Sequence, residues 1–138
     1  MTDCVFCNIV SGKIAALKVY EDNDFIGFLD IAPGNKGHTL IIPKEHCEVL
    51  DKLSDDKAKK LILTVKKVAH AIQLALDPDG YNVLQNNHSA AGQVVPHVHF
   101  HIIPRYNHDE LKFSWPVDEY IDDKEKESYL EKIKSKLK

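Results

Sequence analysis

Three histidines occupy alternate positions in the stretch PHVHFHIIPR. His97, His99 and His101 are separated by Val98 and Phe100. Imidazole is the commonest metal ligand in proteins, and its charge changes near neutral pH, so the neutral ring can also act as a base or nucleophile. The triad could therefore bind a metal ion, attack a substrate, or simply form a polar strand face without a function.

The alternation of histidines with apolar residues predicts a β-strand. Successive side chains of a strand point to opposite faces, so the three histidines should share one face at intervals of about 7 Å. Val98, Phe100 and Ile102 should then point into the core. In a helix the three imidazoles would instead be spread around the cylinder.

The neighbouring residues favour attack on a phosphate over a metal site built from the triad alone. No carboxylate follows the triad, because the next residues are Ile102, Ile103 and Pro104. Upstream, AAGQVV places Gly92 and Gln93 in a turn whose backbone N–H groups can point at an oxyanion. A neutral imidazole beside a bound phosphate can form a covalent adduct with phosphorus, while a second imidazole orients or protonates the leaving group.

A second group of potential ligands begins with the Cys-x-x-Cys motif in CVFC. Cys4 and Cys7 have a spacing found in both zinc sites and redox-active dithiols. A redox site of the thioredoxin kind needs a βαβ unit around the motif, and none is predicted here. A structural zinc site needs about four ligands, so two more would have to come from elsewhere. Two buried free thiols are the alternative.

The remaining strands are predicted from short apolar runs between turns. LKVYEDNDFIGFLDI indicates two β segments around the turn from Glu21 to Asp24, and HTLIIP indicates a short strand that ends at Pro43. YNVLQNN and VPHVHFHII, separated by the loop HSAAGQ, indicate an antiparallel pair.

Two helices are predicted to accompany these strands. SDDKAKKLILTVKKVAHAIQLAL opens with a capping residue, Ser54, and its apolar residues recur at helical spacing. The charged tail from Asp122 to Lys138 predicts a shorter C-terminal helix with a sparse apolar stripe. Five strands and one major helix in segregated runs predict an α+β fold with a mostly antiparallel five-stranded sheet.

The composition is that of an ordinary globular chain. Its 138 residues predict one domain, residues 1–138. The net charge of -3 offers no general attraction for nucleic acid or for an anionic membrane, so neither is expected as a partner. The N-terminus lacks the pattern of a signal peptide, and three cysteines are an odd number for a disulfide framework. We therefore expect a cytoplasmic protein.

Three blocks of the sequence resemble the histidine-triad (HIT) family of nucleotide hydrolases and transferases, in its small dimeric branch. HVHFHII matches the family's alternating motif, within the block LQNNHSAAGQVVPHVHFHIIPR. CVFCNIVSGKI and FLDIAPGNKGHTLIIPKEH look like its other two blocks, in the family's order. Together they cover most of residues 4–105, whereas the tail 106–138, with its one tryptophan, Trp115, carries little family signal.

The resemblance implies roles for individual residues. His99 would be the nucleophile, His101 would contact the α-phosphate or the leaving group, and His38 would orient the triad. The residues implied in nucleotide binding are Asp30, which would accept hydrogen bonds from the ribose hydroxyls, and Asn86, Gly92, Gln93 and Val94 near the phosphate. The alternatives are a core histidine at His38, a turn residue at Asp30 and plain loop residues at Asn86 and Gln93.

The resemblance also implies a structural zinc ion. Some family members bind zinc through the cysteine pair, a histidine after IIPKE and the first histidine of the triad. These ligands correspond here to Cys4, Cys7, His46 and His97. His97 would then be structural, and no catalytic metal is expected.

The implied activity is hydrolysis that releases AMP or GMP through a covalent nucleotidyl-histidine intermediate. The substrate would be a purine nucleoside phosphoramidate or a dinucleoside polyphosphate, and the chain would form a homodimer with a continuous ten-stranded sheet. Many phosphoramidases of the family have a hydroxyl residue where this chain has Val94, which leaves the preference for an amine leaving group open. The alternative is a nucleotide- or zinc-binding regulatory module with weak or no catalysis.

Overall fold

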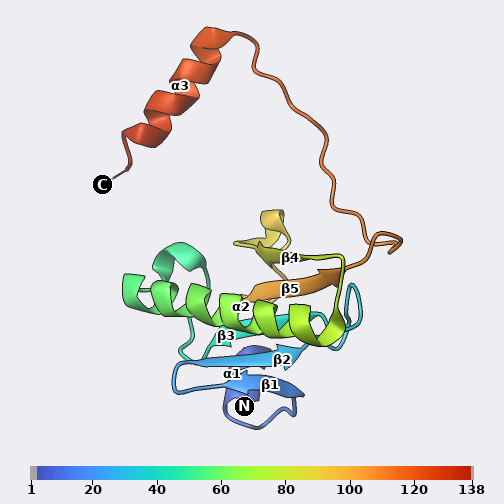
Figure 1. Ribbon diagram of the computed structural model, residues 1–138. Coiled ribbons are helices and arrows are strands. Elements are labelled where there is room, and N and C mark those ends of the chain that lie inside the picture. Colours follow the sequence, from blue (N-terminus) through green and yellow to red (C-terminus); the bar gives the residue numbers. More distant parts are fainter. Residues whose placement is uncertain (1–2, 138) are drawn as a thin grey trace.

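The computed structural model describes residues 3–137 and contains one five-stranded sheet in the order β1-β2-β3-β5-β4 (Figure 1). Every pair of neighbouring strands is antiparallel. The strands are β1 (Lys18–Glu21), β2 (Phe25–Leu29), β3 (Thr39–Pro43), β4 (Gly80–Gln85) and β5 (Phe100–Arg105). The predicted five-stranded α+β fold is confirmed, and β1 and β4 form the two edges of the sheet.

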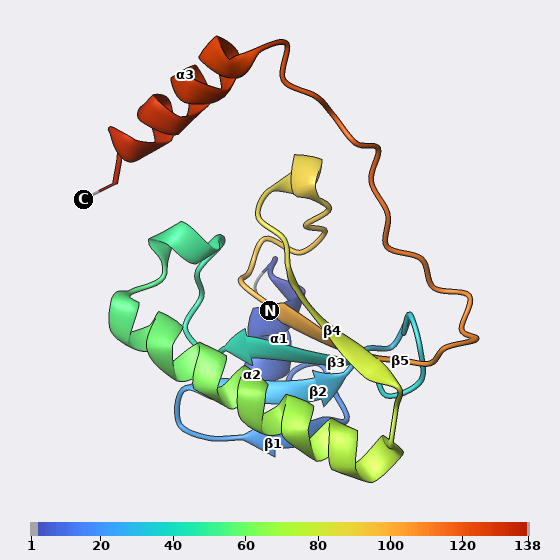
Figure 2. The same ribbon diagram turned by 45° about the horizontal axis from the view of Figure 1, so that its top comes forward.

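Helix α2 (Asp55–Leu76) covers one face of the sheet, as Figures 1 and 2 show. Ser54 caps it by accepting a hydrogen bond from the Lys57 N–H, as the capping signature predicts. Its buried apolar residues pack on alternate residues of β2, β3 and β5, which form the larger part of the core. The residues of this cluster are Phe25, Ile41, Leu53, Leu61, Val65, Val68, Ala69, Ile72, Val98 and Ile102.

A short helix that the sequence did not predict, α1 (Val5–Val10), packs on the opposite face of the sheet (Figure 2). Its Phe6 and Ile9 form a second core cluster with the residues of β2 and β3 that point away from α2. The members of this cluster from the sheet are Ile26, Phe28, Leu40 and Ile42. Both faces of the central strands are therefore covered, and the α1 face is the one that carries His101, the partner of Leu40 in the sheet.

The predicted strand VPHVHFHII is shorter in the structure, because β5 begins only at Phe100. Of the triad, only His101 lies in the strand. Pro43 has no N–H to offer, and its carbonyl accepts a hydrogen bond from the His97 ring at 2.8 Å, so the ladder does not continue upstream. The alternation of faces still holds, since Val98 and Ile102 are fully buried in the α2 core.

The C-terminal helix α3 (Asp123–Lys134) forms as predicted, although it ends before Lys138, which lies outside the described residues. Asp122 caps it, and none of its residues is buried. Figures 1 and 2 show α3 apart from the sheet at the end of an extended segment. None of the helices in residues 3–137 combines the length and the apolar character that a membrane crossing requires.

Candidate active site

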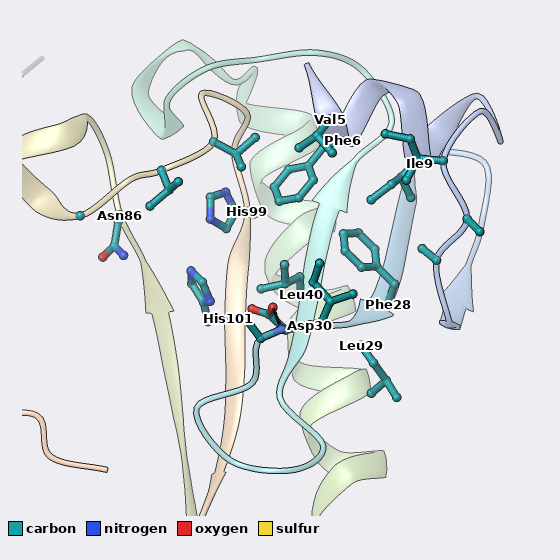
Figure 3. Close-up of a pocket in the computed structure, with 18 residues that line it drawn as sticks. Val5, Phe6, Ile9, Phe28, Leu29, Asp30, Leu40, Asn86, His99 and His101 are labelled. Carbon is teal, nitrogen blue, oxygen red and sulfur yellow. Dashed lines mark hydrogen bonds between the residues drawn. The ribbon is translucent and has the colours of Figure 1, made fainter. Parts of the chain in front are cut away.

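A cavity of about 470 Å³ opens on the α1 face of the sheet. Figure 3 shows that polar and apolar residues line different parts of it, with His99, His101 and Asn86 on one side and Phe6, Ile9 and Phe28 on the other. A ligand that fits this cavity would have a polar part at the histidines and a flat or apolar part beside α1.

His99 is held with one ring nitrogen at a backbone carbonyl. Its Nδ1 lies 2.7 Å from the carbonyl oxygen of His97, which can only accept, so Nδ1 carries the hydrogen. The neutral ring then keeps a lone pair on Nε2. Burial lowers the pKa of His99, against the opposing effect of that hydrogen bond, which favours this neutral form. The ring is only 5% exposed, but it lines the cavity.

His101 has the opposite tautomer, which is set through His38. The Gly34 N–H donates to His38 Nδ1 at 3.0 Å, so the hydrogen of neutral His38 is on Nε2. That nitrogen lies 2.9 Å from His101 Nδ1, which must accept. His101 therefore carries its hydrogen on Nε2 and can donate it to a ligand.

The pKa values of these two histidines favour their neutral forms. Burial, followed by the nearby rings of His99 and His38, lowers the pKa of His101 from 6.5 to about 4. Burial also lowers the pKa of His38, although Asp30 opposes this change. Both rings are consequently uncharged at neutral pH.

Asp30 follows β2 and divides its two oxygens between two tasks. Oδ1 accepts from the Ala32 N–H at 2.9 Å, which is the turn role that the sequence left open. Oδ2 lies 3.6 Å from His38 Nε2, and the residue lines the cavity. The turn role therefore leaves one carboxylate oxygen available for a ligand.

The loop between β4 and β5 brings Asn86, Gly92 and Val94 to the cavity. Gly92 has a φ of 88°, in the left-handed region that favours glycine. Val94 is 89% exposed, so its side chain adds an apolar surface where a hydroxyl would be a donor.

Gln93 differs from these neighbours, because its side chain is used within the protein. Its Oε1 accepts from the His88 N–H at 2.7 Å, and its Nε2 donates to the Glu48 carbonyl at 2.6 Å. Gln93 is buried and is not among the residues that line the cavity. The side chain thus joins two loops, and only the backbone of Gln93 could contact a ligand.

The four implied zinc ligands come together beside the cavity. Cys4, Cys7, His46 and His97 offer ligand atoms that all lie within 4.8 Å of one another. The His97 ring donates through Nε2 to the Pro43 carbonyl, so its Nδ1 keeps a lone pair for the cluster. This group of residues can hold a metal ion.

The distances within the cluster fit tetrahedral zinc. Zinc bonds of about 2.0 Å to nitrogen and about 2.3 Å to sulfur give about 3.3 Å between two nitrogens and about 3.5 Å between nitrogen and sulfur. The two histidine Nδ1 atoms are 3.2 Å apart, and three of the nitrogen–sulfur pairs lie 3.3, 3.4 and 3.7 Å apart. Burial, and then Cys4, raises the pKa of Cys7, so a bound cation would be needed to keep this sulfur as a thiolate.

The apolar side of the cavity was not predicted from the sequence. It consists mainly of Val5, Phe6 and Ile9 from α1 and of Phe28 and Leu40 from β2 and β3. The only signal was an aromatic residue inside the Cys-x-x-Cys motif, and nothing in the sequence shows that this segment folds against β2. Trp115, in contrast, is 80% exposed and does not reach the cavity of its own chain.

Known proteins are similar to this chain in both sequence and fold. The HIT domain model matches residues 11–108. An adenosine 5'-monophosphoramidase of Schizosaccharomyces pombe is 46% identical over 136 residues, which is 98% of either chain. A crystal structure of a HIT family member from Bacillus subtilis has a TM-score of 0.92 and 40% identity, with 99% of each chain covered.

One relative bears on the metal cluster. The crystal structure of a zinc-bound histidine-triad family protein from Mycobacterium smegmatis has a TM-score of 0.76 and 36% identity, and the match covers 98% of both chains. The matched domain, the close relatives and the geometry of the triad agree, and the chain belongs to the HIT family.

Proposed function

We propose that this protein hydrolyses purine nucleoside phosphoramidates, or related conjugates of AMP or GMP, through a nucleotidyl-His99 intermediate. The observation that carries the proposal is the pair of opposite tautomers at the cavity. His99 keeps a lone pair on Nε2, whereas His101 keeps a hydrogen on Nε2, and their ring centroids are 4.9 Å apart. A nucleophile and a hydrogen-bond donor therefore stand side by side.

The reaction would proceed in two displacements. In the first, the lone pair of His99 Nε2 forms a bond to the α-phosphorus while the bond to the leaving atom breaks, and the leaving atom takes up a proton. In the second, water attacks phosphorus, the P–N bond to His99 breaks, and water loses the matching proton. His101 would donate its Nε2–H to a phosphate oxygen or to the leaving atom as a neutral group.

The rest of the cavity would bind the nucleoside. The apolar side formed by α1 and β2 offers a surface for a purine ring, and Asp30 Oδ2 can accept from ribose hydroxyls. On the phosphate side, Asn86, Gly92 and the backbone of Gln93 and Val94 would supply donors. Because Val94 has no hydroxyl, its side chain cannot donate a hydrogen bond to the leaving group. The proposal therefore includes polyphosphate leaving groups as well as amines.

The Cys4, Cys7, His46 and His97 cluster would bind zinc in a structural role. Four protein atoms would fill all four positions of a tetrahedral ion, which would leave no open position for substrate. The ion would join α1 to the segments around His46 and His97, and no step of the proposed reaction passes through it.

A homodimer and a cytoplasmic location also belong to this proposal. The edge strand β4 exposes Tyr81 and Val83, and α3 exposes Tyr129, Leu130 and Ile133. The TM-score of 0.92 to the Bacillus subtilis structure could not be reached if α3 and the segment before it lay elsewhere in that crystal. No residue of α3 is buried by the chain itself, so a second copy that packs against α3 would explain how this helix keeps its position.

The test is to trap the intermediate. Adenosine phosphoramidate labelled at phosphorus should give an acid-labile, protein-bound AMP within one turnover, detected by rapid quenching in base. His99→Ala should abolish both the adduct and turnover, whereas His70→Ala, an exposed histidine on α2, should leave both unchanged. If wild-type protein binds AMP but shows no turnover and no adduct, the alternative of a nucleotide-binding module is correct.

A further inference from the structure

The side chain of Phe6 lies between the metal cluster and the cavity. In the sequence it stands between Cys4 and Cys7. Its ring meets His97 edge-on, with the centroids 5.8 Å apart, and it meets His99 in the same way at 5.1 Å. One buried aromatic ring therefore contacts a member of the metal cluster and the proposed nucleophile, and it also lines the cavity (Figure 3).

Helix α1, which carries this ring, is held by the cluster as well as by its packing on β2 and β3. It has six residues, and isolated helices shorter than about 12–15 residues are marginal in water. Cys4 caps the helix by accepting from the Cys7 N–H at 3.5 Å, and both sulfurs contact histidines of the cluster. The apolar part of the cavity is thus mounted on a segment that its cysteines attach to the rest of the chain.

A backbone contact also links the two sites. The carbonyl of His97 accepts from His99 Nδ1, while the His97 ring contributes Nδ1 to the cluster. A bound ion that restrains His97 would therefore also restrain the group that sets the tautomer of His99. Phe6 contacts the rings of both His97 and His99, so it forms a second link between the two residues, through side chains.

We propose that metal binding in the cluster and nucleotide binding in the cavity are thermodynamically coupled through Phe6. With zinc bound, α1 and Phe6 are already in place when the nucleotide arrives. Without zinc, α1 is held only by its packing on β2 and β3, so nucleotide binding must restrict α1 and Phe6 further, and the lost conformational entropy weakens binding. The inference rests on the proposed function, and it makes Phe6 a positioning residue.

The coupling must act in both directions. If zinc raises the affinity for AMP by some factor, AMP raises the affinity for zinc by the same factor. We expect a factor of about ten, within the usual range of about 5- to 150-fold. The second direction gives a readout that does not involve catalysis.

The experiment measures this factor twice in the full chain. AMP is titrated calorimetrically into zinc-loaded and chelator-treated protein, and the zinc affinity is measured against a chromophoric chelator with and without saturating AMP. The AMP dissociation constant should rise about tenfold on zinc removal, and AMP should strengthen zinc binding equally. Equal AMP affinity with and without zinc overturns the coupling alone, whereas no AMP binding by the zinc-loaded protein overturns the proposed function as well.

Two variants test the part played by Phe6. Phe6→Leu keeps an apolar side chain but removes the ring that contacts both histidines. Val5→Ala is the matched control, because Val5 lines the same cavity from the same helix but has no ring to place against them. AMP binding should weaken in both variants, but only Phe6→Leu should bring the coupling factor close to one.

The comparison of wild type with Phe6→Leu and Val5→Ala tests the role of Phe6 even if zinc removal unfolds the chain. In all three proteins, the zinc affinity with and without AMP can be measured by starting from the folded, zinc-loaded protein and adding the chromophoric chelator. An effect of AMP on zinc affinity that is as large in Phe6→Leu as in wild type overturns the role of Phe6. If Phe6 had a purely structural role, Phe6→Leu would lower the free energy of unfolding but leave the coupling factor unchanged.

Discussion

At the scale of single residues, the three histidines of the triad differ because each ring is held by a different partner. His97 donates to the carbonyl of Pro43, and His99 donates to the carbonyl of His97. His101 instead accepts from His38, whose own tautomer is set by the Gly34 N–H. Identical side chains thus become a candidate metal ligand, a candidate nucleophile and a candidate donor through hydrogen bonds with their surroundings.

The lowered pKa values of His38 and His101 predict the pH dependence of activity. Protonation of His101 would place hydrogens on both nitrogens and break the hydrogen bond from His38. We therefore expect kcat/KM to stay level as the pH falls through 6.5, which is the ordinary pKa of histidine, and to fall only toward pH 4. A pH–rate profile of the free enzyme tests this, and an acidic limb centred at 6.5 or higher would contradict it.

The same shifts predict that the folded chain loses stability in acid. The unfolded imidazole of His101 takes up its proton near pH 6.5, but the folded one does so only near pH 4. Between these values the unfolded state binds more protons, so the free energy of unfolding decreases as the pH falls. Urea unfolding at a series of pH values measures this decrease, which should be smaller in His101→Asn than in wild type.

At the scale of elements, part of the cavity is lined by the loop between β4 and β5, and Gln93 joins this loop to the segment that follows β3. Its amide connects the Glu48 carbonyl to the His88 N–H, at the start of the loop that carries Gly92 and Val94. The glutamine therefore supports the proposed phosphate side of the cavity from behind.

Replacing Gln93 should weaken the fold and the site together. Gln93→Ala removes the hydrogen bonds to the His88 N–H and to the Glu48 carbonyl. Both of these residues are exposed, so each lost bond should cost about 0.5–1.5 kcal/mol. We expect a lower midpoint of urea unfolding and a higher KM. In Gln93→Glu one carboxylate oxygen can still accept from His88, but the other would lie against the Glu48 carbonyl, which also only accepts. This variant should therefore lose more stability than Gln93→Ala, and an unchanged unfolding midpoint in either variant would contradict this role.

At the scale of the whole molecule, both sheet edges expose apolar side chains, but only β4 lies next to the strand that carries His101. On β4, Tyr81 and Val83 are exposed on the face that also carries α2, since Val83 pairs with the buried Ile102. On β1, Val19 is similarly exposed. The proposed ten-stranded sheet needs one edge strand to pair with its counterpart in a second copy, and β4 is the edge next to the strand that carries His101.

Charges on β4 should therefore separate the dimer. Tyr81→Lys combined with Val83→Lys should raise the dimer dissociation constant at least about tenfold, or ~1.4 kcal/mol, because edge lysines oppose strand pairing. Sedimentation equilibrium measures the change. Val19→Lys, on the opposite edge, is the control and should leave the dimer intact, whereas a monomeric wild type would contradict the proposed assembly.

The local elements and the chemistry were accessible from the sequence, because both depend on residue type and spacing. Periodicity and a capping serine predicted α2, and alternating apolar residues predicted the strands. The five-stranded α+β fold and the membership in the HIT family followed from the same patterns and are confirmed. The triad's alternation also held, although β5 begins later than the pattern suggested, because the Pro43 carbonyl is occupied by the His97 ring.

Tertiary structure decided which atom of each residue is available, since that depends on how the folded backbone places its hydrogen-bonding partners. The tautomers of His99 and His101 depend on the His97 carbonyl and on the Gly34 N–H, and no spacing rule shows those contacts. The same holds for Gln93, whose side chain turned out to be occupied by Glu48 and His88. Helix α1 is too short to carry a periodic signal, so its place beside the metal cluster and the cavity came only from packing against β2 and β3.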